Sequence, residues 1–248
     1  MDEQNEKIEG GEVKIKLPTS KKLENFWYYY KWHTIVGVFL VFVAVVLLLQ
    51  TCGKVKTDAY ILYAGPHDVS RVAQNGDISE YESMLSTFKR VCKDQDGDGL
   101  TTIALLDLFV VNQSEANRLL EENPGSEINA ALVKEDTDTL QQKLVVGEYY
   151  LCFLSERLFF EYEEAYEGKL FAPIAAYTKD GGEYEYASEH GIYLSSLPFS
   201  ELPTIADLPS DTVVCIRRFG GFGMGNDEDQ FKVSEEILRN ILSYGISN

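Results

Sequence analysis

The sequence contains few of the residues that build common catalytic and metal centres. It has three histidines and four cysteines in 248 residues, and no two cysteines are spaced as CxxC. Zinc ribbons and thioredoxin-type redox motifs are therefore excluded. No HExxH, GxSxG or Walker sequence is present, so the signatures of a zinc protease, a serine nucleophile and a nucleotide-binding loop are all missing. Ser188-Glu189-His190 has the residue types of a triad only as neighbours, and we interpret it as a polar loop.

Positive charge is also scarce, and its shortage is confined to one part of the chain. The formal net charge is −18. Residues 1–33 carry six acidic and six basic residues, whereas the rest of the chain carries 34 acidic and 16 basic residues. An acidic C-terminal part argues against nucleic acid and anionic lipid as partners of that part, because both are polyanions.

One stretch, Thr34 to Leu49, has no charged residue and only one weakly polar one. As a helix it is roughly 24 Å long, and its flanking turns extend it to about 30 Å, the thickness of a bilayer core. We therefore expect a transmembrane helix over about 34–51. The residues just before it fit an aromatic belt at the membrane interface: Phe26, Trp27, Tyr28, Tyr29, Tyr30 and Trp32.

The basic residues near this helix predict its orientation. More of them precede it (Lys14, Lys16, Lys21, Lys22, Lys31) than follow it (Lys54, Lys56, Arg71). This bias predicts a cytoplasmic N-terminus and an exported C-terminal domain at the plasma membrane, with the helix retained as a signal anchor. Leu49-Gln-Thr-Cys52 resembles a lipoprotein cleavage box, but Gln50 and the late position favour the anchor. We expect a flexible cytoplasmic tail over 1–20, a juxtamembrane and transmembrane helix over 21–52, and an extracytoplasmic domain over 57–248.

The exported part alternates between strand and helix patterns. We expect strands at 58–66, 101–111, 149–154 and 212–217, and helices at 79–92, at 114–122, after Ser155 and at 233–244. Residues 127–146 fit one helix, or a strand followed by a helix, and 170–186 resemble a hairpin. These elements predict an α/β domain with a mostly parallel central sheet and a later antiparallel addition. Cys92, Cys152 and Cys215 have apolar neighbours and are expected to be buried free thiols.

Three stretches carry a resemblance to known proteins: Glu24–Thr34, Tyr63-Ala-Gly-Pro66 and Gly191-Ile-Tyr-Leu-Ser195. Together they resemble a group of uncharacterised single-pass membrane proteins of Firmicutes, chiefly clostridia. The resemblance implies a bacterial plasma membrane and an extracytoplasmic domain, and it brings no catalytic residues. In addition, Leu144–Leu154 is similar to a helix–Gly–strand passage in one lobe of extracellular solute-binding proteins.

Asp94-Gln-Asp-Gly-Asp-Gly99 matches the first half of an EF-hand or dockerin-type calcium loop. Asp94, Asp96 and Asp98 occupy positions one, three and five, and a glycine follows at six. The position of the bidentate glutamate is Leu105, so the second half is missing. Two interpretations stay open. One is an acidic turn, and the other is a weak calcium site completed by the Leu100 carbonyl, by water or by a distant carboxylate.

The stretch Arg217–Gly225 follows a strand and is rich in glycine, but the acidic residues after it disfavour a phosphate ligand. It is either a surface loop or a ligand site. In the second case Phe219 and Phe222 would supply apolar contacts and Arg217 or Arg218 would bind a carboxylate. The acidic residues Glu161, Glu163, Glu164 and Glu167 are interpreted as a solvated helix face, with a hydrolytic carboxylate pair as the alternative.

These observations favour a membrane-anchored domain without catalytic activity that binds a small solute, a wall component or a membrane partner. An exported carboxylate-based hydrolase and a subunit of a larger membrane assembly are the alternatives. A deep pocket lined by converging polar groups would favour the first two hypotheses, and an exposed apolar face would favour the third.

Overall fold

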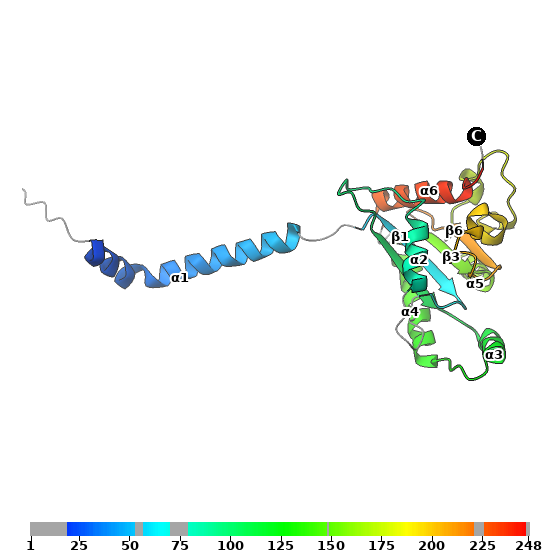
Figure 1. Cartoon of the computed structure of the whole chain (residues 1–248), viewed down its shortest axis with the longest axis horizontal. Coiled ribbons are helices and arrows are strands. Elements are labelled where there is room, and N and C mark those ends of the chain that lie inside the picture. Colours follow the sequence, from blue (N-terminus) through cyan, green and yellow to red (C-terminus); the bar gives the residue numbers. More distant parts are fainter. Residues whose placement is uncertain (1–18, 53–56, 70–78, 148, 221–225, 247–248) are drawn as a thin grey trace, which may run out of the picture. The chain divides into compact units, whose positions relative to one another are not determined.

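The computed structural model describes residues 19–52, 57–69, 79–147, 149–220 and 226–246, and it divides the chain into two units, 1–55 and 56–248 (Figure 1). The first unit contains the helix α1 (Thr19–Cys52). Its segment Phe26–Leu47 has 22 residues and a mean hydropathy of 1.9, and none of it is buried. By length and composition this is one helix that could cross a membrane. Phe39 in its centre is 62% exposed.

The second unit is built on one six-stranded sheet with the strand order β2-β1-β3-β6-β5-β4. The strands β2, β1 and β3 are parallel, and β6, β5 and β4 continue the sheet in antiparallel pairs. The predicted α/β class, with a parallel part and a later antiparallel addition, is confirmed. The strands are β1 (Ala59–Gly65), β2 (Ile103–Phe109), β3 (Leu151–Ser155), β4 (Tyr186–Ser188), β5 (Gly191–Tyr193) and β6 (Thr212–Ile216).

Helices cover both faces of this sheet. The first face packs against α2 (Ser79–Phe88) and α6 (Glu228–Leu242), and the second against α4 (Ala130–Val146) and α5 (Glu156–Ala165). The helix α3 (Gln113–Glu122) has no buried residue, and Figure 1 shows it beyond one end of the sheet. Three short 3₁₀ helices complete the described part: η1 (Ile174–Ala176), η2 (Leu194–Ser196) and η3 (Pro198–Glu201).

The central strands are apolar throughout because both of their faces are buried. In β1, Ile61 and Tyr63 point to the α2–α6 side, whereas Leu62 and Ala64 point to the α4–α5 side. Successive side chains of a strand alternate between faces, so a strand covered on both sides needs a continuous apolar run. The expected buried free thiols, Cys92, Cys152 and Cys215, are found as such.

Caps decide where two of the helices begin. Asn129 Oδ1 accepts from Ala131 N at 3.0 Å, so the ambiguous segment forms a single helix, α4. Asp227 Oδ1 accepts from Asp229 N at 3.0 Å, and α6 therefore begins five residues before the predicted 233.

The predicted hairpin over 170–186 is wrong. Phe171 forms an isolated bridge with Arg217 instead, and residues 174–176 form η1. The hairpin is made by β4 and β5, which pair Tyr186 with Ile192, and its turn is Glu189-His190. The Gly181-Gly182 turn signal was the stronger local pattern, but burial of Ile192 in the sheet determines the pairing.

The outer edge of β2 is contacted by side chains of two helices. The Tyr81 hydroxyl of α2 donates to the Leu105 carbonyl oxygen at 3.0 Å. Phe109 N donates to Asp136 Oδ2 of α4 at 3.0 Å. Because Val110 N donates to Gly65 O of β1, the backbone groups of 105 and 109 face away from β1, and these side chains bond the free edge.

The buried rings of the α2–α6 side give a stability prediction. Phe153 is fully buried and its ring centroid lies 5.3 Å from that of Phe88. In the fragment 56–248, which we expect to unfold in one transition, Phe153→Ala should lower the free energy of unfolding by about 3–5 kcal/mol. Urea unfolding followed by circular dichroism measures this. Phe160→Ala is the matched control, because Phe160 is 40% exposed, and it should cost under about 1 kcal/mol. Equal losses in the two variants would contradict the packing described above.

Candidate functional site

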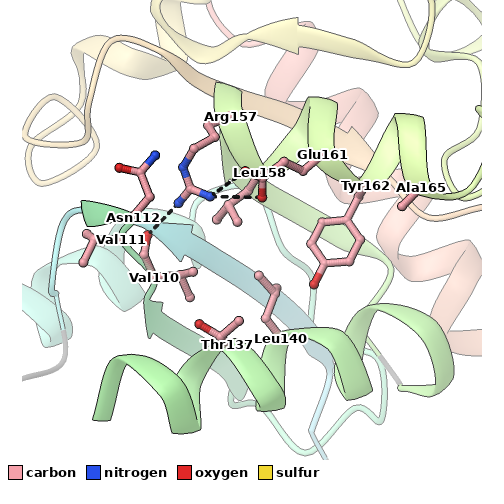
Figure 2. A pocket seen from close by; sticks show the side chains of 10 residues that line it. All are labelled: Val110, Val111, Asn112, Thr137, Leu140, Arg157, Leu158, Glu161, Tyr162 and Ala165. Carbon is pink, nitrogen blue, oxygen red and sulfur yellow. Dashed lines mark hydrogen bonds and ion pairs between the residues drawn. The ribbon is translucent and has the colours of Figure 1, made fainter. Parts of the chain in front are cut away.

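The pocket that we consider as the functional site lies between α4, α5 and the segment that follows β2 (Figure 2). We call it the α4–α5 pocket, and its volume is about 300 Å³. Its position is informative because β2 ends at Phe109 and α5 begins directly after β3. In open α/β sheets, ligands bind outside the carboxyl ends of the parallel strands. The lining residues are Val110, Val111, Asn112, Thr137, Leu140, Arg157, Leu158, Glu161, Tyr162 and Ala165.

The floor of the pocket is apolar. Val110, Leu140 and Leu158 are buried and belong to the core on the α4–α5 side of the sheet. The Thr137 hydroxyl is engaged within α4, where it donates to the Val133 carbonyl oxygen at 2.7 Å. Much of the pocket therefore offers hydrophobic contact, with polar groups near only part of its wall.

Arg157 is the cation of the pocket, and two carboxylates neutralise it. Its Nε donates to Glu115 Oε1 at 3.0 Å and its Nη1 donates to Glu161 Oε1 at 3.0 Å. Figure 2 shows the guanidinium beside Val110, whose carbonyl oxygen accepts from Nη2 at 3.4 Å. Burial lowers the pKa of Arg157, but its hydrogen bonds to Glu115 and Glu161 outweigh burial, so this pKa is raised overall. An anionic ligand would have to compete with both carboxylates.

Tyr162 supplies a hydrogen-bond donor. Its ring stacks on Tyr166 at a centroid distance of 6.2 Å, and Figure 2 shows its hydroxyl directed toward α4. Burial, and then the charges of Tyr166 and Glu161, raise the pKa of Tyr162 to about 12, so the phenol stays protonated at neutral pH. Among the residues that the structure describes, none forms a hydrogen bond with this hydroxyl.

The lining chemistry suits binding better than catalysis. Of the described residues that line the pocket, Glu161 is the one carboxylate, and none is serine, cysteine or histidine. A glycosidase-type mechanism requires two carboxyl groups facing each other across the substrate. The pocket can hold a small molecule with an apolar body, and Tyr162 can donate to an acceptor on it.

In the predicted calcium loop, two of the aspartates lie beside a third carboxylate, Asp58, from a distant part of the chain. Carboxylate oxygens of Asp58, Asp94 and Asp96 all lie within 4.8 Å of one another, and Asp98 is outside this group. Asp58 precedes β1 and is 3% exposed. Three carboxylate oxygens at these distances form part of the ligand set that a hard cation such as Ca²⁺ needs.

The same carboxylates also order the loop itself. Asp94 accepts from Gly97 N at 2.7 Å and from Gly99 N at 2.8 Å, and these bonds, Gly99 first, lower the pKa of Asp94. Asp58 accepts from Gln95 N at 2.8 Å and from Thr102 N at 2.7 Å. Asp98 accepts from Leu100 N at 2.7 Å. Both interpretations of the sequence, the turn and the weak calcium site, fit this geometry.

None of the described residues of the second predicted site, over 217–222, lines the α4–α5 pocket. Arg217 is 1% exposed, and it stacks on the Tyr150 ring at 4.4 Å. Its Nη2 donates to the Gly147 carbonyl oxygen at 2.9 Å, so it satisfies the C-terminal end of α4, and burial lowers its pKa.

The residues that follow Arg217 make contacts of their own. The Phe219 ring packs on Phe231 at 5.3 Å, and Arg218 N donates to the Leu170 carbonyl oxygen at 2.8 Å. Phe222 lies outside the described residues.

Sequence reasoning did not identify Arg157, Tyr162 or Asp58. Arg157 lies one helical turn before Glu161, and Tyr162 lies between Glu161 and Glu163, in an acidic cluster that we interpreted only by its charge. Asp58 is separated from the loop by 36 positions, and only the pairing of β1 with β2 brings it there. The one indication in the sequence was that Asp58 stands at the start of a predicted strand.

The calcium interpretation predicts that Ca²⁺ stabilises the domain through Asp58, Asp94 and Asp96. We expect millimolar CaCl₂ to raise the melting temperature of the wild type, because a ligand of the native state stabilises it, and Asp96→Ala to abolish the rise. Calorimetric titration and thermal melting measure it, with Asp138→Ala on the exposed side of α4 as the control. If the wild type gives neither heat nor a shift, Asp94, Asp96 and Asp98 act as turn residues only.

Comparison of the chain with protein-family models, with curated proteins and with solved structures finds no match. The α4–α5 pocket and the acidic loop therefore have to be interpreted from their own chemistry.

Proposed function

We propose that the chain is a single-pass membrane protein whose acidic α/β domain lies outside the plasma membrane and binds a small amphipathic solute. The observation that carries the proposal is the α4–α5 pocket. It combines an apolar floor, a volume of about 300 Å³ and the protonated Tyr162 hydroxyl at the carboxyl edge of a parallel sheet. Cavities of about this size and composition are typical of small-molecule sites.

The membrane location is supported by α1. The segment Phe26–Leu47 is long enough for a bilayer, and aromatic residues precede its apolar part. The basic residues favour a cytoplasmic N-terminus. The apolar region of a cleaved signal sequence meets the same criteria of length and composition, and the two differ in whether the mature chain keeps residues 1–52.

The pocket also limits the chemistry of the ligand. Because Glu115 and Glu161 already neutralise Arg157, the pocket favours a neutral or cationic molecule over an anion. Tyr162 favours a carbonyl, ether or amine acceptor on that molecule. The hydrolase alternative gains no support from this pocket, and the alternative of an assembly subunit depends on α1, whose apolar side chains are exposed.

The topology predicts where the two ends of the chain lie. A reporter that is active only outside the cell should be active when fused after Asn248 and inactive when fused before Met1. Protein sequencing of the membrane form should recover the original N-terminus, because the anchor is retained.

Two results would contradict this location. A mature chain that begins at or near Cys52 would indicate a cleaved lipoprotein. An inactive C-terminal reporter, with the fusion intact in the membrane, would place the domain in the cytoplasm.

Filling the α4–α5 pocket should abolish ligand binding. The neutral fluorophore N-phenyl-1-naphthylamine serves as a probe, because its fluorescence rises in an apolar site. We expect Ala165→Phe to weaken its binding to the fragment 56–248 by about 10-fold or more, since the new ring occupies the cavity. Fluorescence titration gives the dissociation constants.

Ala175→Phe is the matched control, since Ala175 is exposed on η1 and outside the pocket, and it should leave binding within twofold. Equal binding by wild type and Ala165→Phe would place the probe elsewhere and remove the support for this pocket. Tyr162→Phe tests the donor: it should weaken an acceptor-bearing ligand more than the hydrocarbon naphthalene.

A further inference from the structure

A second cavity lies between α5 and the turn that joins β4 to β5. Its volume is about 450 Å³. It is more polar in its lining than the α4–α5 pocket and contains a histidine. We call it the turn pocket, and its lining residues are Phe160, Glu163, Glu164, Gly168, Ser188, Glu189 and His190.

His190 is held in one orientation by hydrogen bonds. It is 6% exposed, and its Nδ1 lies 2.6 Å from Glu163 Oε1. The same oxygen accepts from the Ser188 hydroxyl at 3.0 Å, and His190 N donates to Ser188 Oγ at 3.0 Å. Gly168 packs against the ring edge, where a Cβ would lie 3.4 Å from Cε1. Residues 189–190 do form a turn, but the His190 imidazole is buried in it. Glu163, which the sequence places on a solvated helix face, is 15% exposed and bonds this imidazole.

The bond to Glu163 decides which nitrogen is available. A carboxylate accepts hydrogen bonds, so Nδ1 carries the proton and neutral His190 has its lone pair on Nε2. Nε2 lies 3.7 Å from Glu189 Oε1, too far for a hydrogen bond. Two ligand atoms on one tetrahedral Zn²⁺ are about 3.3 Å apart, so a small rotation of the exposed Glu189 side chain would place both at bonding distance.

We propose that His190 Nε2 and the Glu189 carboxylate bind a divalent transition-metal ion of the zinc class in the turn pocket. Water completes the coordination, and Glu163 is the positioning residue that fixes the imidazole. This arrangement is a carboxylate–histidine–metal relay, in which the outer carboxylate orients the ring and raises its basicity. The proposal does not depend on the α4–α5 pocket or on calcium binding.

Charge and ligand type both favour this class of ion. Glu163, Glu164 and Glu189 line the pocket, whereas none of its described lining residues is lysine or arginine. The resulting negative potential attracts a cation. An imidazole nitrogen is a ligand for zinc, copper or nickel, whereas calcium and magnesium prefer oxygen.

The chain contains a second histidine–glutamate pair that serves as a matched control. His67 Nε2 lies 2.6 Å from Glu80 Oε1, the same separation as in the His190 pair. His67 is outside the turn pocket and more exposed, with 28% of its side chain accessible. Replacing it removes a histidine and a carboxylate bond without changing the proposed site.

Calorimetric titration of the chelator-treated full chain in detergent with ZnCl₂ tests the proposal. We expect saturable binding at one site that His190→Gln reduces about 30-fold or more. Glu163→Gln keeps an acceptor for Nδ1 but removes the charge, so it should weaken binding about 10- to 100-fold. His67→Gln should bind as the wild type does. Co²⁺ should give the visible absorption of a low-symmetry nitrogen and oxygen site, and Glu163→Gln should shift this spectrum, which a merely structural role would not do.

The proposal would be overturned by no zinc binding by the wild type, by unchanged binding by His190→Gln, or by an equal loss in His67→Gln. Since His190 is buried, its replacement could unfold the β4–β5 turn, and circular dichroism checks this. Glu189 is 80% exposed, so Glu189→Gln leaves the fold intact and must by itself weaken zinc binding. If it does not, the site is refuted.

Discussion

The burial of the central strands on both faces is the constraint on which the rest of the domain depends. The strands β1, β3 and β6 contribute side chains to both cores, so neither face can be left to solvent. The parallel pairs need crossover connections, and these connections supply two of the four covering helices. α2 covers one face on the way from β1 to β2, and α4 covers the other on the way from β2 to β3. The α4–α5 pocket arises where two helices on the same face diverge beside the end of β2.

Local pattern was sufficient for the elements that satisfy this constraint. The apolar runs of β1, β3 and β6 are typical of strands buried on both faces, and the alternation of apolar strands with amphipathic segments predicts the α/β class. Prediction failed where a local signal competed with a distant one. Gly181-Gly182 indicates a tight turn, but the sheet extends from β6, and β5 pairs with it through Ile192 and Val214. The hairpin turn therefore falls at Glu189-His190.

The site residues were harder to predict, because each depends on contacts between distant parts of the chain. The 94–98 loop is visible as a motif, but its third carboxylate, Asp58, is set by the register of β1 and β2. Glu163 belongs to an acidic run that reads as a solvated surface, and only the fold of the β4–β5 turn shows that it bonds His190. Arg217 shows the opposite case: its place beside a glycine-rich segment suggested a ligand contact, and in the structure its Nη2 donates to the Gly147 carbonyl oxygen at the end of α4.

The side chains on the outer edge of β2 have a consequence for how this protein behaves at high local concentration. A seven-residue parallel edge strand offers a template for strand addition by another chain, the first step of many aggregation pathways. Here Tyr81 of α2 donates to the Leu105 carbonyl, and Asp136 of α4 accepts from the Phe109 amide. A strand from another chain would have to displace the Tyr81 and Asp136 hydrogen bonds before it could pair with β2. α2 and α4, which lie on opposite faces of the sheet, thus also close its long edge to intermolecular β-pairing, while the opposite edge, β4, is only three residues long.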